Sequence, residues 1–141
     1  MRMDYYQIDK ALDLLEKAQP NFEAVPKVNR YKVEQFFMDR IEDPKTFIGV
    51  NKDVTAILIL EVGHDYFSTA QSIRDIVFYS ETTGSGFRLL KEAKQWVEAW
   101  GDSVHAAYFG TSLSNGATDK MLERTGLVKI GTQFKFKLGD S

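Results

Sequence analysis

Hydrophobic and polar positions follow different periods along the chain, and the changes in period predict its elements. Between residues 71 and 101 an apolar run, a glycine-rich stretch and an amphipathic stretch follow one another. Residues 73–79 are mostly β-branched or aromatic, which is typical of a buried strand. After residue 87 the apolar residues recur every three or four positions, which predicts a helix that stops at Gly101. Residues 82–86, Thr-Thr-Gly-Ser-Gly, are therefore expected to form a tight turn before this helix.

Two helices and a hairpin are predicted for the N-terminal part. Helical spacing of apolar residues predicts a helix over residues 8–18. Asn29 is expected to cap a second helix, whose apolar face runs from residue 33 to residue 41 and which closes at Asp43-Pro44. Residues 46–50 and 54–62 are predicted to be strands, and the short polar connection between them favours an antiparallel hairpin.

The C-terminal part continues with strand and helix patterns. Residues 104–109 are predicted to form a strand, followed by a short helix over about residues 116–125 with Gly126 as its stop. Residues 127–130 and 133–138 are expected to form the final strand or strands. Because a strand–helix–strand unit usually crosses over to a parallel neighbour, residues 73–79 and 104–109 should pair in parallel.

Composition narrows the classes of function. The 141 residues suit a single domain over residues 1–141, and 43% apolar content indicates a globular protein. A net charge of −2 argues against a nucleic-acid partner. The chain has no cysteine and only two histidines, His64 and His105, so no metal site is expected. The sequence has neither a signal-type apolar core nor a run long enough to cross a membrane, so we expect no membrane partner and a cytoplasmic location.

The glycine-rich stretch has two physical interpretations. A helix N-terminus has unpaired N–H groups and a positive dipole end, and glycines let a phosphate approach them. The same stretch also suits an ordinary capped helix that follows a strand. A dinucleotide fingerprint would need a third glycine where Leu89 stands, and the Gly-Lys-Ser/Thr of a P-loop is absent.

Two motifs carry a resemblance to a known family. Residues 81–86, Glu-Thr-Thr-Gly-Ser-Gly, resemble the acyl-CoA loop of the GNAT N-acetyltransferases, Gln/Arg-x-x-Gly-x-Gly/Ala, at both glycines. Residues 115–127 are similar to the family's Asn…Leu-Tyr-x-x-x-Gly-Phe pattern. The resemblance is firmest over residues 73–130, and it implies an α/β fold of the α+β type, with a mixed central sheet and helices on both faces. The family's first strand has room only in residues 1–6.

The resemblance implies that the chain binds acetyl-CoA or another acyl-CoA as co-substrate. In the family the two strands beside the loop splay apart, and pantetheine lies between them like an added strand. Backbone N–H groups after the strand would hold the pyrophosphate, and Arg88 and Lys120 would help to neutralise it. Asn115 matches the family's CoA-contacting asparagine and is equally suited to cap a helix. The implied coenzyme-binding residues are Ile76, Phe78, Thr83, Gly84, Ser85, Gly86, Phe87, Arg88 and Asn115.

The implied chemistry is direct transfer of an acyl group to an amine, which requires a group that takes the amine's proton. The chain departs from the family at the positions that matter for this. Glu81 replaces Gln or Arg, Leu122 stands where the family often has a proton-donating tyrosine, and Ala70 stands near the usual glutamate base. The resemblance therefore assigns no base.

Substitute catalytic groups lie in or near the strand over residues 73–79. Asp75 is the candidate base, and simple alternation places Tyr79 on the same face. Asp75 is equally suited to a salt bridge at the core edge, and Tyr79 to aromatic packing. Glu61, His64 and Asp65 cluster near a turn, where they are expected to be solvated, and His105 is expected to pack within its strand.

The leading hypothesis is an acyl-CoA-dependent N-acyltransferase acting on a small-molecule or peptide amine. The alternative is a catalytically inactive GNAT-fold binding or assembly protein, of a kind that some phages encode. Glu81 and Leu122 favour the alternative, and the two glycines favour the enzyme. A homodimer is compatible with either hypothesis.

Overall fold

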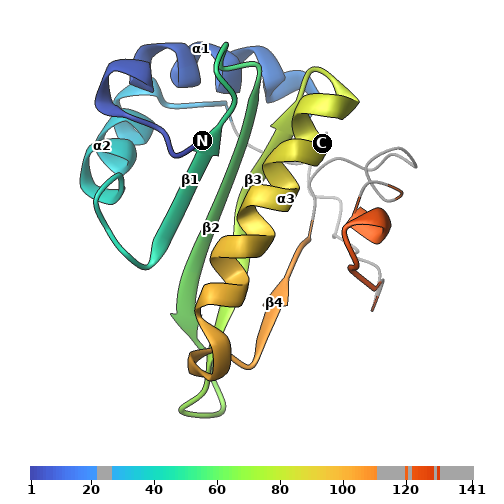
Figure 1. Ribbon diagram of the computed structural model, residues 1–141. Helices are drawn as coiled ribbons and strands as arrows, with labels where there is room; N and C mark the ends of the chain where they lie inside the picture. The colour runs from blue at the N-terminus through green and yellow to red at the C-terminus, as the bar shows by residue number, and fades with distance from the viewer. Residues whose placement is uncertain (22–26, 111–119, 121, 129, 131–141) are drawn as a thin grey trace, which may run out of the picture.

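The computed structural model describes residues 1–21, 27–110, 120, 122–128 and 130, and these residues build a mixed sheet with helices on both faces. The strands follow one another in the order β1-β2-β3-β4. The antiparallel β1–β2 hairpin and the parallel β3–β4 pair confirm the sequence predictions, and β2–β3 is antiparallel. Figure 1 shows this arrangement. The elements are the 3₁₀ turns Tyr5–Gln7, Gln19–Asn21 and Gly101–Ser103, the helices α1 (Ile8–Ala18), α2 (Arg30–Arg40) and α3 (Thr83–Ala99), and the strands β1 (Thr46–Val50), β2 (Ala56–His64), β3 (Gln71–Ser80) and β4 (Ala106–Tyr108).

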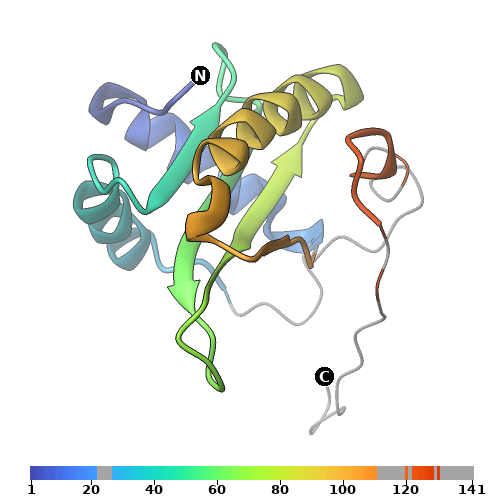
Figure 2. The same ribbon diagram turned by 60° about the horizontal axis from the view of Figure 1, so that its bottom comes forward.

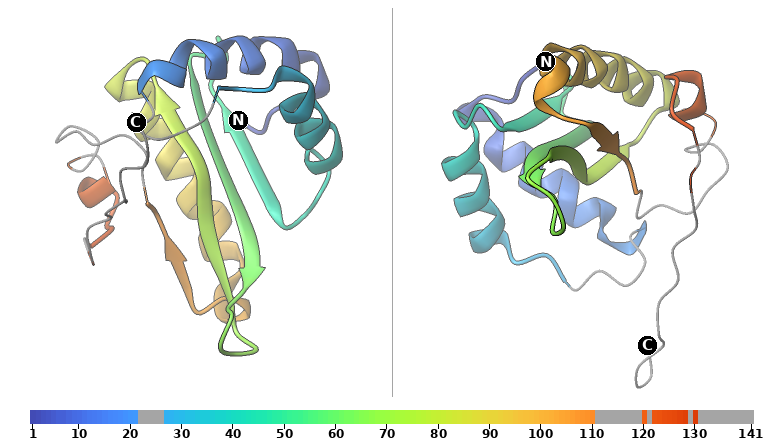
Figure 3. Two further views of the ribbon diagram at one scale, coloured as in Figure 1. Left: turned by 180° about the vertical axis from the view of Figure 1, so that it is seen from behind. Right: turned by 90° about the horizontal axis from the view of Figure 1, so that it is seen from below.

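Two apolar clusters hold the layers together. The first lies between the sheet and α1 and α2, and it contains Leu12, Phe37 and Ile59. The second lies between the sheet and α3, and it contains Leu58 and Leu90. Figures 2 and 3 show the sheet between these two helical layers. β1 and the first half of β2 are buried on both faces, which explains their continuous apolar sequence.

Helices α1 and α2 form at the positions that apolar spacing and capping residues predicted. Helix α1 spans Ile8–Ala18, and its buried residues lie on one face. Helix α2 begins after Asn29, whose side-chain oxygen accepts the N–H of Lys32 at 3.0 Å. The family's first strand, for which the sequence had room only in residues 1–6, is represented by a single antiparallel bridge between Arg2 and Gly49 of β1.

The predicted second strand, residues 54–62, begins later than expected. Val54 has a φ of +54°, which no extended strand contains, and so β2 starts at Ala56. The side chain of Asn51 stabilises this turn, because its oxygen accepts the N–H groups of Thr55 and Ala56, each at 2.8 Å. At the other end β2 continues to His64, which pairs with Gln71 of β3.

The C-terminal part is described only in pieces. Lys120 and residues 122–124 are helical, and Gly126 follows with a φ of +101°, as expected for a helix stop. The predicted strand over residues 127–130 is wrong for its described residues, which have no sheet partner within the described part of the chain. Asn115 and residues 133–138 lie outside the described residues. Within the described ranges, no helix is long and apolar enough to cross a membrane.

Candidate functional site

The glycine-rich stretch is the first turn of α3 rather than a turn before it. The helix begins at Thr83, whereas its periodic apolar face starts only at Phe87. Thr82 is the N-cap: its hydroxyl accepts the N–H of Ser85 at 3.3 Å, and its carbonyl accepts the N–H of Gly86 at 3.2 Å. Sequence periodicity missed this turn, because capping and not apolar spacing sets the start of the helix.

The predicted anion-binding amides therefore divide into two groups. Ser85 and Gly86 donate to Thr82, and Phe87 stands in the fifth helical position, where a regular helix bonds the N–H back to the first carbonyl. The N–H groups of Thr83 and Gly84 have no partner among the residues that the structure describes. A Cβ added at Gly84 would meet no atom of the described residues within 4 Å, so among these residues the space next to the two amides is open.

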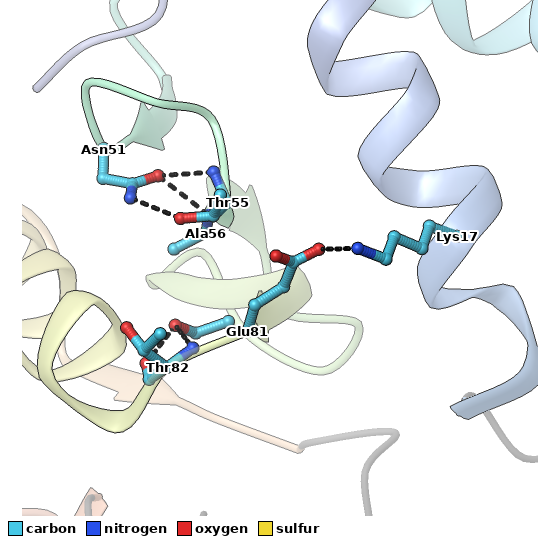
Figure 4. A network of polar contacts seen from close by, with 7 residues as sticks. Lys17, Asn51, Thr55, Ala56, Glu81 and Thr82 are labelled. Atoms are coloured by element: carbon cyan, nitrogen blue, oxygen red, sulfur yellow. Dashed lines mark hydrogen bonds and ion pairs between the residues drawn. The ribbon is translucent and has the colours of Figure 1, made fainter.

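Glu81, the residue that departs from the family loop, is held away from this helix start. Its carboxylate Oε1 lies 2.8 Å from the ammonium of Lys17 on α1, and its own N–H donates to the carbonyl of Thr55 at 2.9 Å. The hydrogen bond to Glu81 raises the pKa of Lys17 above its ordinary value. Figure 4 shows the Glu81 side chain pointing toward α1, while Thr82 caps α3. Sequence reasoning missed Lys17, because no local pattern links it to residue 81.

The strands β3 and β4 part halfway along β3. Their pairing is limited to residues 72–74 of β3 and Ala106–Tyr108 of β4, whereas β3 continues to Ser80. Figures 1 and 3 show β4 beside only one half of β3. The register between β2 and β3 also shifts here, between Ile59 and Leu60, and it leaves Ile76 as an extra residue that is 43% exposed. Beyond Arg74 the edge of β3 that faces β4 therefore has no strand partner in the described part of the chain.

Asp75 lies at the point where the two strands part. Its Oδ1 accepts the N–H of Gly110, just after β4, at 2.9 Å. Burial raises the pKa of the Asp75 carboxyl, and hydrogen bonds from the amides of Gly110 and Asp75 itself offset part of that rise. No salt bridge to this carboxylate occurs among the described residues, so the salt-bridge alternative for Asp75 is not supported.

Tyr79 does not share the face of Asp75, and this expectation from simple alternation is wrong. Asp75 pairs with Leu60, which packs in the α3 cluster, whereas Tyr79 pairs with Ile57 and packs against the α1–α2 cluster. The extra residue at Ile76 reverses the alternation between them. A catalytic role for Tyr79 remains a prediction from the sequence, without the expected partnership with Asp75.

The other titratable candidates have partners of their own, and Asp65 and His105 lie at the end of β3 that is far from α3. The carboxylate of Asp65 contacts His105 Nε2 at 2.5 Å and accepts the hydroxyl of Ser72 at 3.1 Å. Burial acts to raise the pKa of Asp65, but the hydrogen bonds with His105 and Ser72 outweigh it and the pKa is lowered. Glu61 is paired with Arg40 at 2.9 Å. The Asp65 contacts brace the β2–β3 turn, and the Glu61–Arg40 pair joins β2 to α2. Neither set of contacts includes the Asp75 carboxylate.

Of the remaining predicted residues, Phe78 is buried in the α3 cluster, and Arg88 is exposed on α3. Leu122 packs against the same cluster. No group of three or more potential metal ligands occurs in the described ranges.

Comparison with known proteins shows the fold. No family sequence model matches the chain, and no curated protein sequence matches it either. Solved structures match over nearly the whole chain at low identity. A protein from Arthrobacter sp. FB24 that is assigned as an acetyltransferase has a TM-score of 0.74 and 8% identity, covering 97% of this chain and 93% of its own. A GNAT family acetyltransferase from Staphylococcus aureus has a TM-score of 0.62 and 15% identity, covering 98% and 96%.

A third similar structure bears on the coenzyme. A protein from Clostridium acetobutylicum that is assigned as an acetyltransferase, solved with acetyl-CoA, has a TM-score of 0.64 and 11% identity, covering 98% of this chain and 94% of its own. The chain therefore has the fold of the GNAT acetyltransferases, as the two sequence motifs implied.

Proposed function

We propose that the protein is an acyl-CoA-dependent N-acyltransferase that transfers an acyl group, most simply acetyl, directly to an amine. The observation that carries this proposal is the parting of β3 and β4. Pairing with β4 stops at Arg74, and from there toward the start of α3 this edge of β3 has no strand partner in the described part of the chain. An extended polar chain can add to such an edge as a further strand would.

The residues at the two ends of this edge fit an acyl-CoA. At the α3 end, the open amides of Thr83 and Gly84 and the positive end of the helix dipole suit a diphosphate. Arg88, exposed one turn further along α3, adds a positive charge. Along the edge, pantetheine would lie against the backbones of Ile76 and Phe78. The exposed glycine at position 84 matters because a side chain there would occupy the space next to the amides.

Asp75 is the residue that we assign as proton acceptor. An amine nucleophile with an ordinary pKa near 10.4 is mostly protonated at neutral pH, so a base must take its proton. The raised pKa of Asp75 makes its carboxylate a stronger base than a solvated aspartate. Asp75 takes one proton from the ammonium, the freed nitrogen bonds to the thioester carbon, and the C–S bond breaks to release the CoA thiolate. The nitrogen loses its second proton as the amide forms. Leu122 cannot relay this proton, so water carries it to the thiolate, and Asp75 returns its own proton to solvent.

One observation favours the inactive alternative. The side chain of Leu122 is packed against the apolar cluster under α3 and cannot donate a proton. A protein that binds the coenzyme without turnover would have the same fold and the same open amides. Binding and turnover must therefore be measured separately.

Calorimetric titration with acetyl-CoA tests the binding part of the proposal. We expect the wild type to bind and Gly84→Val to raise the Kd by at least about tenfold, because the valine fills the space beside the amides. Gly63→Val is the matched control, since a Cβ at this exposed strand position also meets nothing within 4 Å but lies on β2. An absence of heat with the wild type at millimolar acetyl-CoA would refute the proposed function, and equal affinities of the two variants would refute the assigned diphosphate position.

Turnover is measured by the release of CoA thiol against a panel of amines. Because the chain has no cysteine, a thiol reagent gives no background from the protein. We expect Asp75→Asn to lower kcat by about 10²-fold while the Kd for acetyl-CoA stays unchanged. Binding without turnover on any amine would support the inactive alternative. Turnover that is unchanged in Asp75→Asn would exclude Asp75 as the base.

A further inference from the structure

The ion pair between Lys17 and Glu81 is the feature that neither motif implies. Glu81 directly precedes the N-cap Thr82, so it lies next to the part of α3 that would receive a diphosphate. Consecutive Cα atoms are about 3.8 Å apart, so the backbone of Glu81 is within about 8 Å of that of Thr83. That distance is similar to the screening length at physiological salt. An unpaired carboxylate at this position would repel a bound diphosphate.

The structure neutralises this carboxylate from a distant element. Lys17, in the last turn of α1, contacts Glu81 at 2.8 Å, and the Glu81 side chain is 26% exposed while that of Lys17 is 69% exposed. The bond from the Glu81 N–H to Thr55 fixes the backbone at the same point. Glu81 lies one residue beyond β3 and two beyond Tyr79, and its side chain points to the α1 face and not toward α3.

The neighbouring charges do not replace Lys17 in this role. On α1, Asp13 and Glu16 are both engaged by Arg30 at 2.8 and 2.5 Å. Lys10, two turns earlier on α1, is exposed and forms no salt bridge among those that the described residues make. Tyr79 also acts on Lys17 electrostatically, in the same direction as Glu81.

We propose that Lys17 is a positioning residue for acyl-CoA binding, which holds the Glu81 carboxylate on the α1 face and so keeps the start of α3 receptive to a diphosphate. This inference rests on the proposed function, because it needs the coenzyme's diphosphate to lie at Thr83 and Gly84. It makes Glu81 compatible with the acyl-CoA loop: the charge is present, but it is paired and directed elsewhere.

Calorimetric titration with CoA, at 0.05 and 0.5 M NaCl, tests this role. Lys17→Met keeps the apolar stem and removes the charge. We expect it to raise the Kd about three- to tenfold at low salt and to leave it near the wild-type value at high salt, because salt screens exposed charges. Adding Glu81→Gln to Lys17→Met should restore at least the wild-type affinity. Lys17→Arg should bind like the wild type, and Lys10→Met is the control for loss of a lysine on α1.

The outcomes separate the alternatives. If Lys17→Met/Glu81→Gln binds as weakly as Lys17→Met, Lys17 attracts the coenzyme itself and the inference is wrong. If the loss of affinity in Lys17→Met persists at 0.5 M salt, the change is structural, and the inference is again wrong. If the wild type binds CoA and Lys17→Met binds it equally well, this inference fails while the proposed function stands. If the wild type does not bind CoA, both are overturned.

Discussion

Replacing Gly49 with alanine tests how α3 is seated on the sheet. Gly49 lies in β1 opposite Leu58, at a point where α3 crosses the strand. A Cβ there would be 2.6 Å from Cε1 and 2.7 Å from Cζ of Phe47, and 2.8 Å from Cδ1 of Leu89 on α3. The side chains of Phe47 and Leu89 are only 1% and 2% exposed, so neither can move into solvent. Alanine at position 49 would therefore push the Phe47 ring and the Leu89 side chain away from β1 within a packed core.

Two opposing contributions determine how much Gly49→Ala changes the free energy of unfolding. Overpacking a dense core costs about 1–3 kcal/mol, whereas Gly→Ala at a compatible backbone gains about 0.4–1 kcal/mol by restricting the unfolded chain. The overpacking term is larger, and we expect Gly49→Ala to lower the free energy of unfolding by about 1–2 kcal/mol. For a chain of 141 residues this corresponds to a fall in Tm of about 3–7 °C.

Thermal and urea unfolding followed by circular dichroism measure this change. Gly63→Ala is the matched control: it changes a glycine on the neighbouring strand β2, where an added Cβ meets no described residue within 4 Å. We expect Gly63→Ala to be as stable as the wild type or slightly more so. If Gly49→Ala melts at or above Gly63→Ala, the close approach of α3 to β1 is wrong. Phe47→Leu, which removes the ring atoms that the new Cβ would meet, should recover part of the loss when it is combined with Gly49→Ala.

Two further predictions concern single side chains. Burial raises the pKa of Asp75 in the folded state above its unfolded value, so the folded protein loses stability as pH rises through that folded pKa. In differential scanning calorimetry, Asp75→Asn should therefore have a higher Tm than the wild type at pH 7, and this difference in Tm should shrink as pH falls toward 4. A difference in Tm that does not depend on pH would refute the burial argument. Asn51→Ala removes the acceptor of the Thr55 and Ala56 N–H groups and should lower the free energy of unfolding by about 1–3 kcal/mol in urea titrations, whereas the exposed neighbour Lys52→Ala should change it by less than about 0.5 kcal/mol.

Elements with local signals were predictable from the sequence. The apolar stripe of residues 8–18 matches α1 at both ends, and Asn29 caps α2 as expected. β1 over residues 46–50 also matches, because its continuous apolar run is bounded by Pro44 on one side and a polar turn on the other. In each case the decisive interaction joins residues only a few positions apart, so the pattern along the chain contains it.

Features that depend on distant contacts were not predictable. The alternation of β3 reverses at Ile76 because β2 pairs with it out of register, and nothing in residues 73–79 alone indicates this shift. The prediction that Tyr79 shares the face of Asp75 was therefore wrong, although the strand itself was predicted correctly. The pairing of Glu81 with Lys17 likewise depends on where α1 lies over the sheet. Even the start of α3 was missed, because Thr82 caps the helix before its apolar period begins.

The energetics of Asp75 bear on the choice between an enzyme and an inactive binding protein. A half-buried carboxylate with a raised pKa costs folding free energy at neutral pH, and hydrogen bonds from two amides recover only part of it. An asparagine would accept the same N–H of Gly110 without that cost, since its side-chain oxygen occupies the same place. The ionisable group is thus unnecessary for holding β3 to the segment after β4, and it lies where these strands part. Costs of this kind are characteristic of sites that perform chemistry, which favours a proton-accepting role for Asp75 over a purely structural one.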